Sequence, residues 1–425
     1  MTSLPDPLAG LRGGQAGSQT AAGSRPSAGS PAAPGSPAAP EAGRGSGRAG
    51  PAPVDASQVK TTTLHVHGAD ARSRGLQRAA QAAARIRATA RGYDELFAHY
   101  DISQRQVREA GRASLDALRA WDPEQFAEVS AVATGSGMQV TDLASTVART
   151  EILTLADKSR PQPSECSTVG WQAPGASAAA QTWDWHAEFA ACWHYQRVSA
   201  LPGEVDHAGF AEYGMLGKIG MNAAGVGVIL NILNHRDDAP GGVPVHAVLA
   251  GLLARARTAA EAVELIRSAG TTSSSVLTVV DPDTVVMVEI SPHGTAAHSQ
   301  PGWAGHTNHF LFPEVAEGGI PLSGTSRSEE RLASVTGRYE GAGPPADADA
   351  LIPLLATDPA AGLVSQVPAP DAPFGERTAT LVTVRLDPAL RRARLSPGIP
   401  QYAHRATAEF VLDPPGHAGA EAPGE

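Results

Sequence analysis

Cys166 is the residue of this sequence best suited to covalent chemistry. It lies in Ser164-Glu-Cys-Ser-Thr-Val169, where a proline-containing loop gives way to a strand-like run. A lone cysteine is ordinarily a small buried hydrophobe. At the first residue of a strand, however, its sulfur could attack the peptide bond on its own N-terminal side. Cleavage there would leave Cys166 with a free α-amine, whose pKa near ~7.7 to 8.0 would let one residue act as nucleophile and base.

Two pairs of histidines suggest metal ligands, but their surroundings in the sequence favour other roles. His65 and His67 would share one face of a short strand, and no third ligand is in view. His306 and His309 are three residues apart, with no acidic or thiol partner apparent. Solvated or hydrogen-bonded histidines are therefore favoured over a metal site.

The glycines between residues 214 and 227 invite a phosphate-loop interpretation. No Gly-Lys-Ser/Thr ends the run, and the Gly-x-Gly-x-x-Gly order of dinucleotide-binding loops is absent. A tight strand-turn-strand unit with Asn222 and Gly225 in the turn is preferred. The second cysteine, Cys192, is expected to be a packing residue.

Hydrophobic periodicity predicts the elements that must position Cys166. Apolar residues at helical spacing predict helices over 72–90, 103–121, 123–133 and 143–152. Short apolar and aromatic runs between turns predict strands over 61–67, 167–171, 178–185, 193–201, 215–221 and 226–233. A helical interval over 245–269, strands over 274–280 and 285–290, helices around 328–335 and 347–355, and strands over 379–386 and 392–395 follow. Alternating groups of helices and strands indicate an α+β fold built in layers.

Composition excludes several classes of partner. The 425 residues include 33 Lys and Arg against 43 Asp and Glu, a net charge of −10 that argues against nucleic-acid binding. No uncharged apolar stretch reaches the ~18 residues needed to span a bilayer, so no membrane partner is expected. Two cysteines cannot build a disulfide framework, which fits a reducing, cytoplasmic location. Residues 1–56 are nearly all Gly, Ala, Pro and Ser and are expected to form a disordered tail.

Several short motifs follow one another in a fixed order along the chain. They are Arg149-Thr-Glu151, Cys166-Ser-Thr, Gln181-Thr-Trp-Asp-Trp185, Gly217-Lys-Ile-Gly-Met-Asn-Ala-Ala-Gly-Val226 and His306-Thr-Asn-His-Phe310. Together they resemble the motifs of the acyl-coenzyme A:6-aminopenicillanic acid acyltransferase family, whose members are self-processing N-terminal nucleophile hydrolases. The resemblance extends from about Lys60 into the C-terminal region.

The resemblance implies a four-layer αββα sandwich, cleavage before Cys166, and transfer or hydrolysis of an acyl group from an amide or thioester. Asp184 lies 18 residues after Cys166 (184 minus 166), where the family has an aspartate that orients the new α-amine. Asn308 matches an asparagine whose side-chain NH2 donates to the oxyanion, and Arg377 resembles an arginine near the family's active site. From the residues alone, Asp184 could be the solvent-facing residue of an alternating strand and Asn308 a turn residue.

The resemblance also divides the chain. After the tail, residues 57–165 would form a helical first chain and residues 166–425 a catalytic second chain, the two fragments remaining associated as a heterodimer. The partner would be a small-molecule amide or thioester. No metal or redox cofactor is needed, and acyl-coenzyme A could serve as a substrate.

One departure from the family pattern motivates an alternative. The family commonly has glycine before the nucleophile, whereas this chain has Glu165, whose side chain restricts the backbone and adds charge beside the bond to be cut. The alternative is an unprocessed, non-catalytic binding or structural relative of the same fold.

Overall fold

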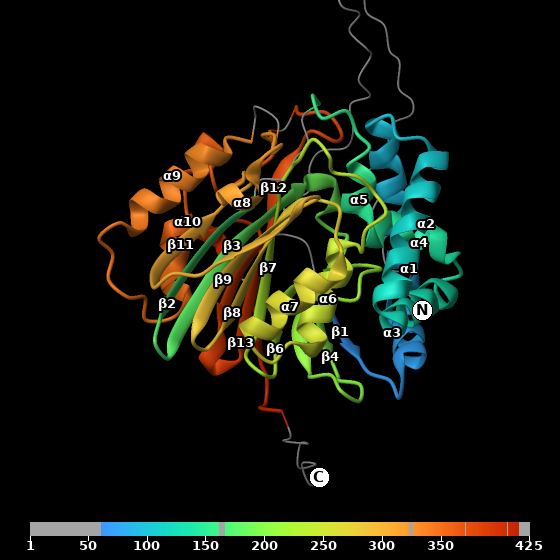
Figure 1. Cartoon of the computed structure of the whole chain (residues 1–425), viewed down its shortest axis with the longest axis horizontal. Helices are drawn as coiled ribbons and strands as arrows, with labels where there is room; N and C mark the ends of the chain where they lie inside the picture. Colours follow the sequence, from blue (N-terminus) through green and yellow to red (C-terminus); the bar gives the residue numbers. More distant parts are fainter. Residues whose placement is uncertain (1–60, 161–165, 323–325, 370, 406, 416–425) are drawn as a thin grey trace, which may run out of the picture.

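Two β-sheets lie face to face between layers of helices (Figure 1). The computed structural model describes residues 61–160, 166–322, 326–369, 371–405 and 407–415, so the expected tail over 1–56 lies outside the described residues. The first sheet has the order β1-β4-β5-β6-β7-β8-β9-β10. Its strands are β1 (Thr63–Val66), β4 (Trp193–Val198), β5 (His207–Glu212), β6 (Ile219–Asn222), β7 (Gly227–Ile232), β8 (Ser275–Asp281), β9 (Thr284–Ser291) and β10 (Gly294–His298).

The second sheet carries Cys166 at its rim, directly before β2. Its order is β11-β2-β3-β12-β13-β14, with β3 paired antiparallel to both β2 and β12. The strands are β2 (Ser167–Ala173), β3 (Ala176–His186), β11 (Gly302–His306), β12 (Thr378–Asp387), β13 (Arg392–Pro397) and β14 (Ala408–Val411). Residues of β2, β3 and β13 contact the first sheet, and the apolar side chains between the sheets form one core cluster.

Helices cover the outer face of each sheet. α6 (Val245–Arg255) and α7 (Ala259–Ala269) contact the first sheet, and α9 (Ser328–Tyr339) and α10 (Ile352–Leu355) contact the second. The N-terminal helices join the first of these layers in a shared apolar cluster, and they are α1 (Ala71–His99), α2 (Gln104–Trp121), α3 (Pro123–Gly135) and α4 (Val140–Val147). Two further short helices are α5 (Arg149–Leu153) and α8 (Pro313–Ala316). The expected α+β class and αββα layering are confirmed.

The segment before Cys166 and the segment after it are joined by more than the covalent chain. β1 pairs in parallel with β4, with Thr63 opposite Tyr195. The buried carboxylate of Glu128 in α3 bonds Arg74 and Arg78 of α1, and Arg78 also donates to Gln196 of β4 at 2.8 Å. Strand β1 and helix α1 of the first segment thus bond directly to strand β4 of the second.

Most predicted elements are present, with differences at their ends. The helix expected over 72–90 extends to His99 because Tyr93, Leu96 and Phe97 continue its buried stripe. The helix expected over 143–152 is two helices, α4 and α5, separated at Ala148. The Asn222 turn is confirmed, since its Oδ1 accepts hydrogen bonds from two backbone amides within the turn.

Hydrophobic periodicity did not predict four of the observed strands, namely β5, β10, β11 and β14. Of the strand expected over 215–221 only the C-terminal part is present, as β6. The unpredicted β5, His-Ala-Gly-Phe-Ala-Glu, has a composition with little β propensity. Gly209 of β5 lies opposite Gly220 of β6, and a Cβ on Gly209 would come within 2.1 Å of the Ile219 carbonyl oxygen. The glycines there permit a close approach of two backbones. In the part of the chain that the structure describes, no helix combines the length and apolar character needed to cross a membrane.

Candidate active site

Cys166 is buried directly before β2 and belongs to the core cluster between the two sheets. It is 3 % exposed, and its Sγ lies 3.7 Å from the backbone oxygen of Asp184. Burial, followed by the negative charge of Asp184, raises the pKa of the Cys166 thiol to about 12. The thiol of the intact chain is therefore neutral at physiological pH. Glu165 and the bond that precedes Cys166 lie outside the described residues.

Asp184 is a buried residue of β3, so the interpretation of it as a solvent-facing strand residue is wrong. It is 0 % exposed, and its Oδ2 accepts a hydrogen bond of 3.2 Å from the Thr182 hydroxyl. The hydroxyl of Thr182 in turn accepts the backbone N–H of Ser167 at 3.3 Å. The carboxylate is thereby tied to the backbone one residue from Cys166.

Arg331 of α9 joins the backbone of Cys166 to the side chain of Asn308. Its Nη1 donates to the Cys166 carbonyl oxygen at 3.0 Å and to the Ser167 hydroxyl at 3.1 Å. Its Nη2 donates to Oδ1 of Asn308 at 2.9 Å. Sequence reasoning missed Arg331, because Ser-Glu-Glu-Arg-Leu is an ordinary helical stretch and 165 residues separate it from Cys166.

The Arg331 contact also determines the orientation of the Asn308 amide. Guanidinium groups only donate hydrogen bonds, so the atom of Asn308 that faces Arg331 must be the oxygen. The NH2 group then faces the other way and donates to the Ile232 carbonyl oxygen at 2.8 Å. This contact accounts for one of its two N–H bonds.

A second amide side chain, that of Asn231 in β7, reaches the nucleophile from the opposite sheet. Its Nδ2 donates to the Cys166 carbonyl oxygen at 2.9 Å, and its Oδ1 accepts from Thr168 at 2.7 Å and from Gln181 at 3.1 Å. The backbone of Cys166 is thus held by Asn231 of the first sheet and by Arg331 of α9. The run Leu-Asn-Ile-Leu-Asn around Asn231 offered no spacing signal that could have revealed this contact.

A buried charged cluster stands beside the two tryptophans of β3. The Glu212 carboxylate pairs with Lys218 at 2.6 Å and with Arg149 at 3.0 Å. The Lys218 ammonium lies 3.8 Å from the ring centre of Trp183, and the Arg149 guanidinium lies 3.9 Å from that of Trp185. Both distances are within the range of cation–π attraction.

Burial and neighbouring charges shift the pKa values of both Lys218 and Glu212. Burial lowers the pKa of Lys218 to about 7, despite the opposing effect of Glu212. Burial would raise the pKa of Glu212, but the Arg149 and Lys218 cations hold it below its ordinary value. The positive charge of Lys218 also acts to lower the pKa of Cys166. Lys218 is thus an electrostatic neighbour of the thiol.

A pocket opens beside Trp185, the residue after Asp184. Its cavity volume is about 30 Å³, which is space for one or two water molecules. Ile232, whose carbonyl oxygen accepts from Asn308, lies in its wall. Other residues that line it are Tyr100, Arg149, Lys158, His186, Asp238 and Ser274.

Arg377 lies just before β12, against a buried carboxylate. Its Nε donates to the Ala372 carbonyl oxygen at 2.6 Å, and its Nη1 lies 3.9 Å from Glu188. Glu188 also accepts the backbone N–H of Gly375 at 3.1 Å. These contacts hold Arg377 against the segment that precedes β12. The contacts around Cys166 involve a different set of residues, namely Asp184, Asn231, Asn308 and Arg331.

The histidine pairs have the hydrogen-bonded or exposed roles that were expected. Nε2 of His306 pairs with Glu289 at 2.7 Å, an acidic partner that the sequence did not reveal, and His309 bonds Ser328 at 2.8 Å. His65 of β1 and His67, which directly follows this strand, are exposed. Cys192 is buried in the core, as predicted.

A family model and two known proteins match parts of this chain. The model of the family described as acyl-coenzyme A:6-aminopenicillanic acid acyl-transferase matches residues 171–401, which include Asp184, Asn308 and Arg377 and begin five residues after Cys166 (171 minus 166). The chain is 26 % identical over 194 residues to the acyl-coenzyme A:6-aminopenicillanic-acid-acyltransferase 40 kDa form of Emericella nidulans; this match covers 45 % of the chain and 53 % of that protein.

Among solved structures, the penicillin V acylase of Agrobacterium tumefaciens is similar at 14 % identity and a TM-score of 0.31, over 55 % of this chain and 82 % of that one. The chain thus spans about half the length of the curated relative it matches, while the family model covers more than half of the chain. The chain belongs to the acyl-coenzyme A:6-aminopenicillanic acid acyl-transferase family.

Proposed function

We propose that this chain is a self-processing cysteine acyltransferase or amide hydrolase, with Cys166 as the nucleophile, acting on a small-molecule amide or thioester. The observation that carries the proposal is the convergence at Cys166. The backbone oxygen of Asp184 lies 3.7 Å from its sulfur, and Arg331 links its backbone to Asn308. These residues come from the position before β2, from β3, from α9 and from the segment after β11, so only the folded chain brings them together.

Self-cleavage supplies the base that the intact chain lacks. In the intact chain the nitrogen of Cys166 is an amide, and the thiol has a raised pKa. Attack of Sγ on the Glu165 carbonyl carbon transfers that acyl group from nitrogen to sulfur and frees the Cys166 amine. Water then cleaves the thioester, which leaves a carboxylate on Glu165 and a thiol on Cys166.

The processed residue then has what acyl transfer needs. The α-amine, with a pKa near ~7.7 to 8.0, accepts the thiol proton as sulfur attacks the substrate carbonyl. The second N–H of Asn308, together with a backbone N–H, donates to the oxyanion, a contact worth roughly 2.7 to 4 kcal/mol in comparable sites. The amine or thiol leaving group departs with the proton, and water or an amine cleaves the acyl-thioester on Cys166.

Neighbouring groups support this chemistry. The Asp184 carboxylate would hold the new ammonium through charge-assisted hydrogen bonding. Arg377, which lies beside Glu188, remains a predicted site residue. The steps need no metal or redox cofactor, and acyl-coenzyme A as donor is tested by measuring thioester consumption.

The test compares intact masses of the denatured wild-type, Cys166→Ala and Cys192→Ala proteins. Cys192 is a matched control because it is the other buried cysteine of the chain. We expect two fragments that meet between Glu165 and Cys166 in the wild type and in Cys192→Ala, and an uncut, inactive chain in Cys166→Ala. Cleavage and amide or thioester turnover that persist in Cys166→Ala would refute the proposal.

A second candidate function rests on Glu165, which departs from the family pattern. If its side chain prevents cleavage, the protein is a non-catalytic binding relative with the same fold. Glu165→Gly distinguishes the two cases. Cleavage that appears only in this variant would support the hypothesis that the natural chain is non-catalytic. Cleavage of both proteins would support the self-processing enzyme.

A further inference from the structure

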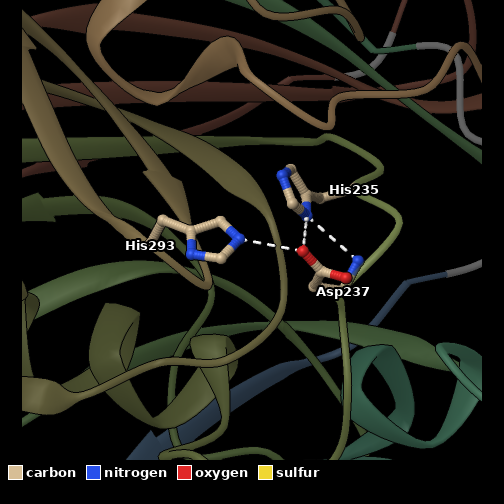
Figure 2. Close-up of side chains that lie close together, drawn as sticks. All are labelled: His235, Asp237 and His293. Atoms are coloured by element: carbon tan, nitrogen blue, oxygen red, sulfur yellow. Dashed lines mark hydrogen bonds and ion pairs between the residues drawn. The ribbon is translucent and has the colours of Figure 1, made fainter.

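Three potential metal ligands converge on the loop between β7 and α6. They are His235 and Asp237 of this loop and His293 of the turn between β9 and β10 (Figure 2). Nε2 of His293 lies 2.9 Å from Oδ2 of Asp237, and Nδ1 of His235 lies 3.8 Å from the same oxygen. All three ligand atoms lie within 4.8 Å of one another.

His235 is held in the tautomer that a metal ligand requires. Its side chain is fully buried, and its Nε2 lies 2.6 Å from the Glu317 carbonyl oxygen. A carbonyl oxygen only accepts hydrogen bonds, so Nε2 carries the proton and Nδ1 carries the lone pair. Nδ1 faces Asp237 and accepts its backbone N–H at 3.0 Å. Metal-ligating histidines commonly donate their second ring N–H to a carbonyl in this way.

We propose that His235, Asp237 and His293 form a binding site for a divalent transition metal of the zinc class. Two ligands on a tetrahedral zinc ion, with bonds of about 2.0 to 2.1 Å, lie about 3.3 Å apart. The observed separations of 2.9 and 3.8 Å bracket this value, and the exposed side chains of His293 and Asp237 can rotate towards the buried His235. Two imidazoles and a carboxylate suit zinc, while the fourth position would take water. The metal replaces the hydrogen bond between the Asp237 amide and His235.

The site would join three segments that lie far apart in the sequence. The loop of His235 and the turn of His293 supply the ligands, and a β-bridge between His235 and Gly319 adds the segment after α8. Asn234 and Asp238 of the same loop line the pocket beside Trp185. A bound ion would therefore stabilise one wall of that pocket, and this conclusion does not depend on the role of Cys166.

A histidine–carboxylate pair elsewhere in the chain provides the matched control. Nε2 of His298 lies 2.9 Å from Glu314, the same separation as between His293 and Asp237. His298 belongs to none of the three-ligand groups in the described part of the chain. The side chains of His293 and Asp237 are 61 % and 51 % exposed, so their replacement leaves the core intact.

The experiment titrates Zn²⁺ into the tag-free, chelator-treated full chain by calorimetry. We expect one Zn²⁺ per wild-type chain and per His298→Ala chain, with affinity at least tenfold weaker in His293→Ala and in Asp237→Asn. A Zn²⁺-dependent rise in the unfolding temperature should follow the same order. Circular dichroism of each variant checks that it is folded.

Cobalt distinguishes this site from zinc binding at a cysteine. Co²⁺ in the wild type should show the visible bands of four-coordinate cobalt without a thiolate charge-transfer band. The proposal is overturned by absent stoichiometric binding, by equal affinity in all four proteins, or by a thiolate band that persists in His293→Ala.

Discussion

Arg331 and Asn308 share a buried hydrogen bond of 2.9 Å that decides which way the asparagine amide points. The same guanidinium donates to the backbone oxygen of Cys166 at 3.0 Å. One side chain from α9 therefore aligns the proposed nucleophile with the proposed oxyanion donor. Arg331 is a positioning residue in this arrangement, because it acts through Asn308 and the backbone of Cys166.

Replacing Arg331 with lysine should slow the reaction more than it weakens substrate binding. The lysine keeps the charge but cannot donate to Cys166, Ser167 and Asn308 in the fixed fork of a guanidinium. We expect turnover to fall roughly 10- to 100-fold with little change in KM, since a lost hydrogen bond to a charged group costs about 1.5 to 3 kcal/mol. Steady-state kinetics with an amide or thioester substrate measures the effect.

Arg338→Lys is the control for this variant, because Arg338 is on the same helix and its side chain is solvent-accessible. It should retain wild-type kinetics. Equal turnover in Arg331→Lys and Arg338→Lys would show that Arg331 has no positioning role.

Lys218 should make the stability of the protein depend on pH. Its pKa is about 7 in the folded chain, against about 10.4 in an unfolded one. Between these values the unfolded chain binds a proton that the folded chain does not, so the free energy of unfolding rises with pH. Lys218→Met removes this contribution. Urea unfolding at several values between pH 7 and 9 should therefore give a steeper rise for the wild type.

The partly exposed Lys158 serves as the comparison for this measurement. Lys158→Met leaves the buried ammonium of Lys218 in place and should keep the wild-type pH slope. Parallel slopes for the wild type and Lys218→Met would contradict the expected shift of the Lys218 pKa.

Gly209→Ala should destabilise the protein by separating β5 from β6. The new Cβ would lie 2.1 Å from the Ile219 carbonyl oxygen and 2.6 Å from Cα of Gly220, and both are backbone atoms that cannot rotate away. We expect a loss of about 1 to 3 kcal/mol, seen as a lower thermal unfolding temperature. At Gly343 a Cβ would meet no atom within 4 Å, so Gly343→Ala should unfold like the wild type. An unchanged unfolding temperature in Gly209→Ala would mean that the two strands pair less closely.

The sequence by itself determined the features that depend on near neighbours. Helical spacing predicted α2 almost to the residue, and alternation with turn residues predicted β3, β8 and the Asn222 turn. The ordered motifs pointed to Cys166, Asp184 and Asn308. All of these signals are carried by short segments, because hydrophobic periodicity, turn chemistry and motif spacing act over a few residues.

Only the tertiary structure decided which distant side chains meet. Arg331 reaches Cys166 across 165 residues, and Asn231 reaches it across 65. The burial that lowers the pKa of Lys218 likewise depends on its contacts with Trp183 of one sheet and Glu212 of the other. Strands such as β5 form because glycines allow close pairing with a neighbour, which local propensity does not encode. Contacts between the sheets and the helix layers form only when the whole chain packs. These contacts surround Cys166 with the groups that make it a candidate nucleophile.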